Sequence, residues 1–377
     1  MASSLPNNPS LDRLRRDARR LQRADDIPLH QAQLAVARGY GFSGWPALVR
    51  YLREAAGLTV DPSRIDESGL DVADRFCALA SLRYDDADAP PRWTSAAELV
   101  RAQPELVDRH VWAAASAADP DALARHAAHG GASATGGPYG WTPLMYLAYG
   151  RAPLGRSERD VLAAATVLLD AGADPNAGYL WCGMATPFTV LTGVFGEGEQ
   201  GPRRQPRHPF APALARLLLE RGAHPVDQQT LYNRMFRAGD AHLELLFEFG
   251  LVSAGPSPWE RRLGEAMETR TQMWQRQVQW AAEHGFGARL ELLARHGVDT
   301  TGVTLVSHAE DPHARDDDGA TALHRAAWDG DLDLIRRLLD AGADPSVTEP
   351  RFGATPLGWA EHAYQTEAAE LLRSVIA

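Results

Sequence analysis

The sequence has no lysine, so all 38 of its basic residues are arginines. Cysteine is also scarce: Cys77 and Cys182 are the only two, too few for a disulfide scaffold or a cysteine-based zinc site. The apolar stretch at residues 161–169 is far shorter than the roughly 18 residues that cross a bilayer. Residues 1–10 are polar and lack the apolar segment of a secretory signal. We therefore expect a cytoplasmic protein with no membrane partner.

Acidic residues outnumber basic ones by 49 to 38, which gives a net charge of −11. This balance argues against broad nucleic-acid binding, because nucleic acids are themselves polyanions. The charge is uneven: residues 11–56 carry nine arginines against five acids, a local charge of +4 that leaves −15 for the rest of the chain. Hydrophobic residues make up 45% of the 377, which is typical of a folded chain with roughly two to three domains or one long repeat array.

One pattern of residues recurs along the chain. Its clearest copy lies within residues 316–345, where Gly-Ala-Thr-Ala-Leu-His at 319–324 is followed by Leu-Leu-Asp-Ala-Gly-Ala-Asp at 338–344. Other copies occupy residues 140–175, 186–223 and 353–372, and weaker ones residues 112–131, 234–250 and 278–297. That makes about seven units, more than the three or so that a repeat array needs for stability.

These segments resemble the ankyrin repeat, with its Thr-Pro-Leu-His-x-Ala-Ala and Leu-Leu-x-x-Gly-Ala-Asp signatures; in the clearest copy Ala322 replaces the usual proline. Threonine and proline suit a helix start, and the glycine suits a left-handed helix end. The resemblance implies an all-α ankyrin-repeat solenoid, built from paired antiparallel helices with finger loops, over residues 110–377. It also implies that a protein or peptide binds in the concave groove, and it implies no chemistry.

The N-terminal third of the chain differs from the repeats. The pattern predicts an arginine-rich amphipathic helix at 11–23 and further helices at 29–38 and 46–55. Residues 32–46 resemble a short helical module that precedes ankyrin repeats in a bacterial family. We therefore divide the chain into a basic helical module, a linker, a helical cap with a degenerate first repeat, and the repeat solenoid, at residues 1–56, 57–70, 71–134 and 135–377.

Two insertions separate paired helices, at residues 151–160 and 196–209. The second is rich in glycine, proline and arginine, and we expect it to be a mobile surface loop. Residues 256–277 are expected to add a helix, because Ser257 and Pro258 make a favourable helix start.

The ankyrin alignment places a set of side chains on the groove, including the aromatic and arginine residues that most often dominate binding energy. Tyr139, Trp141 and Tyr149 are expected to face the groove from one unit, with Trp141 partly exposed. The full set of expected binding residues is Tyr139, Trp141, Tyr149, Arg237, Glu283, His284, Asp317, Asp318, Trp328 and Asp329.

An enzyme is the first alternative, because a histidine beside carboxylates can act as a general base. The candidate catalytic residues are Arg237, Glu283, His284, Asp329 and His362. A closed pocket that holds His284 and His362 with a carboxylate would favour an enzyme, and an open surface would favour binding. His324 is instead expected to be structural, because the corresponding histidine of ankyrin repeats bonds the backbone between fingers.

A DNA-associated regulator is the second alternative. The helices at 29–38 and 46–55 faintly resemble a helix-turn-helix, and arginines of the helix at 11–23 could contact phosphates. The turn of seven residues is longer than the usual three or four, so we favour a docking or capping role and do not expect a nucleic-acid partner.

No cofactor or metal is assigned. The loop at 307–313 offers two histidines and two acids, but its spacing matches no metal motif known to us. The acidic run at 316–319 lacks the alternating ligands of an EF-hand. Cys182 is expected to be an inert thiol, and a small-molecule ligand for the groove is left open.

Overall fold

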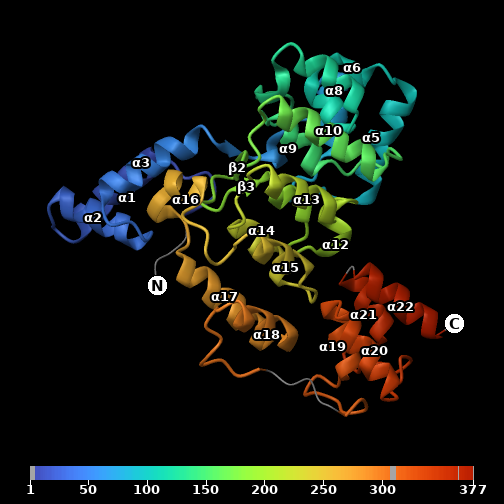
Figure 1. Ribbon diagram of the computed structural model, residues 1–377. Helices are drawn as coiled ribbons and strands as arrows, with labels where there is room; N and C mark the ends of the chain where they lie inside the picture. Colours follow the sequence, from blue (N-terminus) through green and yellow to red (C-terminus); the bar gives the residue numbers. More distant parts are fainter. Residues whose placement is uncertain (1–4, 306–310, 364, 377) are drawn as a thin grey trace.

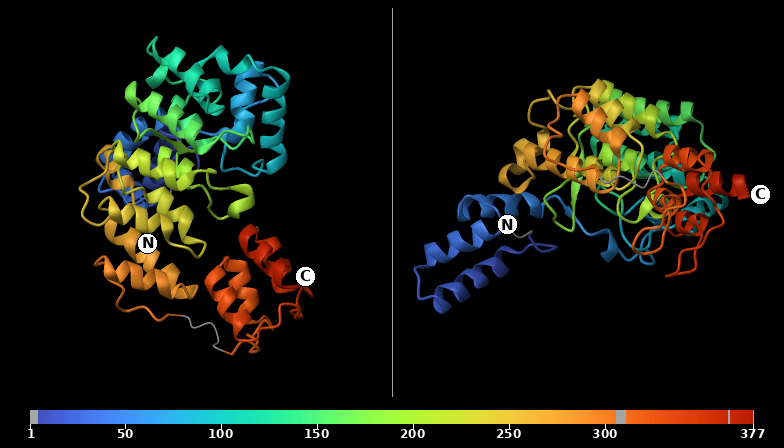
Figure 2. Two further views of the ribbon diagram at one scale, coloured as in Figure 1. Left: turned by 45° about the vertical axis from the view of Figure 1, so that its right-hand side comes forward. Right: turned by 90° about the horizontal axis from the view of Figure 1, so that it is seen from below.

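The computed structural model describes residues 5–305, 311–363 and 365–376, and this part of the chain is mainly helical (Figure 1). The expected N-terminal helices are present with nearly the predicted limits, as α1 (Leu11–Ala24), α2 (Leu29–Gly39) and α3 (Trp45–Ala56). Leu14, Leu48 and Tyr51 form their core together with Trp259 of α16 (Pro258–Leu263). Figure 2 shows these N-terminal helices projecting from the side of the remaining structure.

The segment expected as a linker contains a strand, β1 (Thr59–Val60), followed by the short helix η1 (Pro62–Arg64). β1 pairs in parallel with β2 (Gly178–Trp181), and β2 pairs in the antiparallel direction with β3 (Phe188–Thr189). The backbone N–H of Leu180 donates to the carbonyl of Leu58 over 2.8 Å. The small sheet therefore fastens the N-terminal helices to the middle of the chain.

Residues 72–295 form a stack of helices around one continuous apolar core, which we call the helix stack. It begins with α4 (Val72–Ala80), α5 (Pro90–Ala102) and α6 (Leu106–Arg109). The pairs that follow are α7 (Val111–Ser116) with α8 (Pro120–Ala127), α9 (Pro143–Tyr149) with α10 (Glu158–Asp170), α11 (Val190–Phe195) with α13 (Ala211–Glu220), α14 (Gln228–Met235) with α15 (Ala241–Glu248), and α17 (Arg270–Glu283) with α18 (Gly287–Arg295). Short 3₁₀ helices are η2 (Gly131–Ser133) and η3 (Gly264–Ala266). As expected, residues 256–277 add helical structure.

Local sequence accounts for many of the helix limits. Ser157, Ser257 and Thr269 each cap a helix start in a capping box with the residue three positions on. Leu168 and Leu218, one from each of two closing motifs, are fully buried. Gly193 allows close packing of α11 on α9, because a Cβ at this position would lie 2.3 Å from the Tyr149 ring.

The C-terminal unit comprises α19 (Ala322–Asp329), α20 (Leu332–Asp340), α21 (Pro356–His362) and α22 (Thr366–Ile376). It has its own apolar core, in which Leu323, Ile335 and Leu372 are fully buried. Leu338 is buried as its place in the repeat predicts, and Leu339 is half-buried. The repeats expected over 135–377 are thus divided between two cores, and Figures 1 and 2 show the unit set apart beyond α18.

Among the described residues, two polar contacts join the C-terminal unit to the helix stack. The backbone N–H of Ala238 donates to the carbonyl of Asp329 over 3.3 Å. The side chain of Arg207 lies 3.6 Å from that of Glu367 in α22. The unit therefore meets the turn after α14 and the insertion at 196–209.

That insertion is not the surface loop that we expected. Glu197, Gln205 and His208 are buried, and the segment contains the short helix α12 (Gly201–Arg204). Glu197 forms ion pairs with Arg234 and, at 3.0 Å, with Arg207. The polar side chains of the insertion find partners inside the molecule, so its glycine-rich and proline-rich sequence packs rather than extending into solvent. None of the helices in the described parts of the chain has the length and apolarity to cross a bilayer.

Candidate functional site

The aromatic residues expected at the groove are buried, so this expectation was wrong. Tyr139 and Trp141 are each 3% exposed and Tyr149 is fully buried. The Trp141 ring packs against Tyr139, Tyr179 and Tyr149 at centroid distances of 4.5, 4.8 and 4.9 Å. The Tyr149 hydroxyl donates to the carbonyl of Thr189 over 3.0 Å. Residues of β2 and β3 cover the face on which the repeat alignment placed a groove, which makes these rings part of the core.

The five candidate catalytic residues do not form one site. His284 stacks on Trp280 with ring centroids 3.9 Å apart, and Glu283 accepts a hydrogen bond from Gln279 over 2.8 Å. Glu283 lines a hollow of about 870 Å³ beside residues 297–304, whereas His362 lies in the C-terminal unit. The acid–base arrangement that would have paired the two histidines is therefore not present in the described residues.

Arg237, Asp329 and His362 do lie near one another, where the helix stack meets the C-terminal unit. Arg237 and His362 line the same pocket, and Asp329 is buried beside the turn that carries Arg237. Burial raises the pKa of Asp329 to about 7, although the positive charge of Arg237 opposes this shift. Sequence analysis thus identified three members of this junction but grouped them with two residues that lie elsewhere.

A cleft of about 450 Å³ opens on the C-terminal unit, and we call it the aromatic cleft. Trp328 of α19 and Phe352 of the loop before α21 are 42% and 70% exposed beside it. The Trp328 ring lies 5.7 Å from the rings of both Trp359 and His362. The cleft is lined by Asp318, Arg325, Trp328, Glu349, Arg351, Phe352, Ala354, Gly358, Trp359 and His362. Of the expected binding residues, Asp318 and Trp328 line this cleft, and Asp317 is exposed in the adjacent turn.

The walls of the aromatic cleft are held by polar contacts. The Glu349 carboxylate accepts hydrogen bonds from the backbone N–H groups of Arg351 and Phe352 at 2.6 and 3.0 Å, which fixes the loop. Arg325 is paired with Asp318 at 2.9 Å, and its guanidinium lies 5.1 Å from the Trp359 ring centre. The Arg351 guanidinium lies 4.9 Å from the Phe352 ring centre.

His324 packs against Trp359, with ring centroids 5.3 Å apart, and has the predicted structural role. The backbone N–H of Thr321 donates to His324 Nδ1 over 3.2 Å, so the proton of the neutral ring is on Nε2. Nε2 then donates to the carbonyl of Ala354 over 3.1 Å and joins the two finger loops. Burial lowers the pKa of His324, which favours this neutral form.

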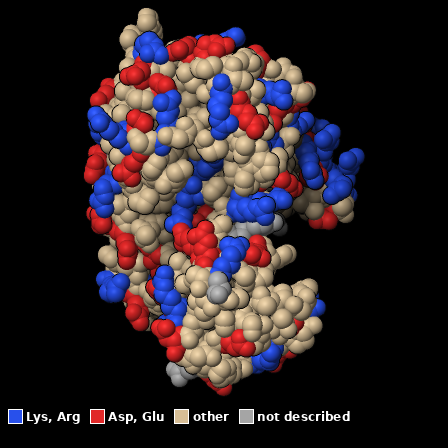
Figure 3. Space-filling view, turned by 90° about the vertical axis from the view of Figure 1, so that its right-hand side faces the viewer, with Lys and Arg blue, Asp and Glu red and all other residues tan. Residues whose placement is uncertain are grey.

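A second pocket of about 300 Å³ also borders Trp328, and we call it the arginine pocket. It is lined by Glu199, Gln200, Arg204, Arg237, Trp328, His362 and Ala363. Trp328 and His362 line both the arginine pocket and the aromatic cleft, so the two are neighbours. Figure 3 views this side of the molecule and shows basic and acidic side chains interspersed over its surface.

Residues 305–357 match the family model for ankyrin repeats, which its description gives as occurring in many copies. This region is therefore similar to ankyrin repeats. It contains α19, α20 and the start of α21, so the aromatic cleft is formed largely by the matched repeats, and we call α19–α22 the ankyrin unit. The serine/threonine-protein kinase VIK of Arabidopsis thaliana is 44% identical over 68 residues, which cover 17% of this chain and 15% of the kinase.

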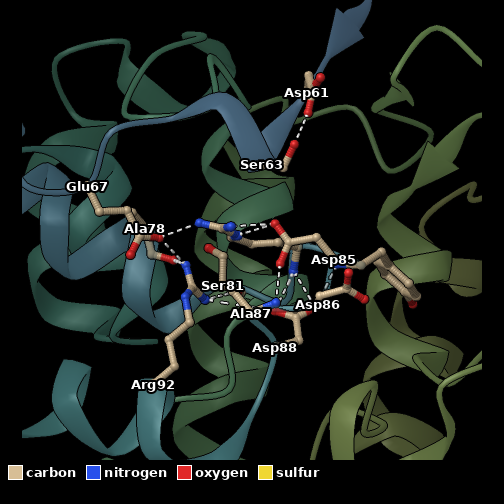
Figure 4. A network of polar contacts seen from close by, with 12 residues as sticks. Asp61, Ser63, Glu67, Ala78, Ser81, Asp85, Asp86, Ala87, Asp88 and Arg92 are labelled. Carbon is tan, nitrogen blue, oxygen red and sulfur yellow. Dashed lines mark hydrogen bonds and ion pairs between the residues drawn. The ribbon is translucent and has the colours of Figure 1, made fainter. Parts of the chain in front are cut away.

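A buried ionic network outside the ankyrin unit supports the arginine pocket (Figure 4). Glu67 pairs with Arg83 and Arg92, each at 2.6 Å, and Asp88 accepts hydrogen bonds from the backbone N–H groups of Arg83 and Tyr84. Burial raises the pKa of Asp88 to about 7, although Arg92 opposes the shift. The side chains of this network are paired with one another and with backbone groups, so we assign it a structural role.

The loop fixed by this network holds α12 in place. Asp86 accepts a hydrogen bond from Gln200 through its side chain and one from Arg204 through its carbonyl, both at 3.1 Å. The sequence analysis missed this contact between segments 114 residues apart. The sequence does contain an acidic run at 85–88 and an arginine-rich run at 203–207, and their opposite charges could have indicated this contact.

The remaining candidates have different outcomes. Part of the proposed metal loop, including His308 and Glu310, lies outside the described residues. The described residues contain no group of three potential metal ligands. Cys182 is buried, and burial raises the pKa of its thiol to about 12, which fits the expected inert thiol. The alternative in which α1 contacts DNA, which we do not favour, stays untested.

Proposed function

We propose that the chain is a protein-binding module, and that the aromatic cleft of the ankyrin unit holds an extended peptide segment of its partner. The observation that carries the proposal is the pair of exposed aromatic side chains, Trp328 and Phe352, around a cleft of about 450 Å³. Exposed apolar surface in a concave site is typical of interaction sites, and tryptophan is among the most frequent anchors of binding energy.

The chemistry of the cleft favours a peptide with an apolar or aromatic side chain. Trp328, Trp359 and Phe352 supply flat apolar surfaces, while Gly358 and Ala354 leave room between them. The charged groups at the rim are mostly occupied within the protein, as Arg325 is by Asp318 and Glu349 is by backbone N–H groups. An apolar side chain can therefore enter the cleft without leaving one of these charges unpaired.

The proposal extends to the architecture and location of the chain. We infer that the pairs from α7–α8 to α17–α18 are divergent ankyrin-type units, which with the two pairs of the ankyrin unit make the seven expected. Their paired helices, buried leucines and glycine-ended second helices support this inference. The scarcity of cysteine supports the proposed cytoplasmic location.

An enzyme is less well supported, because Glu283 and His284 lie apart from His362. The similarity to a kinase covers 15% of that protein. Protein kinases position ATP with a lysine and a glycine-rich loop, and this sequence has no lysine. We therefore do not carry kinase chemistry over to this chain.

A displayed library of random twelve-residue peptides, selected against the full chain, tests the proposal. Trp328→Ala and Phe352→Ala should each weaken the selected peptides by about thirtyfold or more, as expected for an aromatic anchor. Val252→Ala is the matched control, because Val252 is also 42% exposed but lines the hollow beside Glu283. The proposed site would be refuted if the selected apolar peptides bound Trp328→Ala and Phe352→Ala as tightly as the wild-type protein.

A further inference from the structure

The arginine pocket shares a wall with the aromatic cleft, so one bound segment can reach both. Trp328 and His362 line both spaces, and their rings lie 5.7 Å apart with planes inclined by 30°. Consecutive residues of an extended chain are about 3.8 Å apart at Cα. A peptide with its apolar side chain in the cleft can therefore place a nearby residue in the arginine pocket.

The two arginines of the pocket have no carboxylate partner within ion-pair distance among the described residues. Arg204 donates to the carbonyl of Asp86 and, at 3.4 Å, to the amide oxygen of Gln200. Arg237 donates to the carbonyl of Phe236 over 2.9 Å, and its Nε is buried without a hydrogen-bond partner. The described residues thus leave both guanidinium groups without a carboxylate partner, and Arg237 Nε remains a free donor.

The acidic groups that face this pocket are largely occupied. The Glu199 carboxylate accepts a hydrogen bond from the Tyr232 hydroxyl, and Glu197 is paired with Arg207 and Arg234. Asp329 is buried near Arg237 and is only partly ionised at neutral pH, because burial raises its pKa to about 7. The pocket is thus locally positive on a chain whose net charge is −11.

The pocket is also preformed, which lowers the entropic cost of binding. Arg204 is held through Asp86 by the ionic network of Figure 4. The carbonyl of Arg237 accepts a hydrogen bond of 2.6 Å from Arg289, a side chain that is 1% exposed. Two arginines fixed on separate segments form a site for a group with several oxygen acceptors.

We propose that the arginine pocket binds an anionic group of the same peptide, either a carboxylate or a phosphate, close to the apolar side chain that enters the aromatic cleft. This inference rests on the proposed function and specifies the class of partner: a segment with an apolar residue and an acidic or phosphorylated residue in extended proximity. His362, stacked on Trp328, forms the boundary between the two parts of the site.

Synthetic peptides carrying one selected apolar residue provide the main test. At the adjacent positions they should carry alanine, glutamate or phosphoserine, and their affinities should be measured in low and physiological salt. We expect an anionic peptide to bind at least tenfold more tightly than its alanine counterpart, with an advantage that declines as salt rises. The tighter of the glutamate and phosphoserine peptides identifies the source of the anionic group.

Arg204→Gln and Arg237→Gln should each reduce this advantage, and the double variant should abolish it while the alanine peptide binds as before. Arg216→Gln, which removes an exposed pair with Glu248 in another hollow, is the control. Equal affinity for the three peptides, or an advantage that survives the double variant, would overturn the inference and leave the aromatic cleft intact.

Inorganic phosphate separates the two proposals, because it needs no apolar anchor. In protein labelled at arginine, titration with phosphate should shift the Nε–Hε resonance of Arg237. Phe352→Ala should preserve the shift, because Phe352 lines the aromatic cleft and not the arginine pocket. If peptides fail to use the cleft but phosphate still shifts this resonance, the anion site stands without the proposed function. Unchanged arginine resonances at tens of millimolar phosphate would count against the anion site itself.

Discussion

Trp141 shows how a single residue can satisfy a sequence motif for binding and still belong to the core. Its position in the finger motif suggested a groove-facing anchor, but four tyrosine rings surround it and leave it 3% exposed. The repeat motif fixes where the backbone turns. It carries no information about β2, the segment more than thirty residues later that covers this face.

Replacement of Trp141 by alanine should therefore destabilise the protein rather than weaken binding. Removal of a buried tryptophan typically costs about 3–5 kcal/mol, because apolar contacts are lost and a cavity remains. Thermal unfolding should show a clear fall in melting temperature, and peptides of the aromatic cleft should bind the folded variant normally. Trp141→Phe, which keeps a ring in place, should recover part of the loss. A melting temperature equal to that of the wild type would contradict the buried position.

His242 is a buried residue with an unusual cost, since neither ring nitrogen has a hydrogen-bond partner. Burial lowers its pKa well below the usual value, and the charges of Arg234 and Arg289 lower it further. The folded state therefore keeps His242 neutral, whereas the unfolded chain protonates it below about pH 6.5. Below pH 6.5 proton uptake by the unfolded chain therefore lowers the free energy of unfolding. The loss is up to about 1.4 kcal/mol for each pH unit, and it is absent above pH 6.5.

His242→Leu should consequently stabilise the protein by about 1 kcal/mol at pH 7, because it removes an unsatisfied buried polar group at similar volume. The gain should grow between pH 6.5 and pH 5, since the variant cannot take up a proton on unfolding. Urea titrations of both proteins at pH 7, 6 and 5 measure the difference. A difference that is constant with pH would show that His242 is not held neutral in the folded state.

At the scale of the helices, sequence predicted much of the fold. The ends of α1, α2 and α3 agree with prediction within about two residues, because amphipathic spacing and breakers such as Gly39 are local signals. The leucine pairs of the closing motifs likewise predicted buried positions such as Leu168 and Leu338. These features need only short-range information, so a single sequence contains them.

Elements that depend on distant partners could not be predicted in this way. Strand β1 has two residues and exists because Leu58 and Val60 bond to a segment about 120 positions later. The insertion at 196–209 has the composition of a loop, but Glu197 finds Arg234 and Arg207 inside the molecule. The candidate site was found in part for the same reason: Trp328 follows from the repeat, whereas Arg204 reaches the site only through a long-range contact with Asp86.

Over the whole molecule, the division into two cores carries consequences for unfolding. The ankyrin unit has an apolar core of its own, and its polar contacts with the helix stack, within the part of the chain that the structure describes, lie at Asp329 and Glu367. Repeat proteins lose structure in units coupled through their interfaces, and a gap in the shared core weakens that coupling. The ankyrin unit should therefore open at a lower free energy than the stack.

Leu338→Ala tests this division, because Leu338 lies in the core of the ankyrin unit and is 5% exposed. The variant should lose about 2–5 kcal/mol of stability in that unit. Hydrogen exchange measured by mass spectrometry in low urea should show faster exchange over α19–α22, with α7–α14 unchanged. Leu218→Ala in α13 is the reciprocal control, since its side chain is buried in the core of the stack. Leu218→Ala should accelerate hydrogen exchange in the neighbouring helices of the stack. If Leu338→Ala instead accelerated exchange equally in both parts, the chain would unfold as one cooperative body despite its two cores.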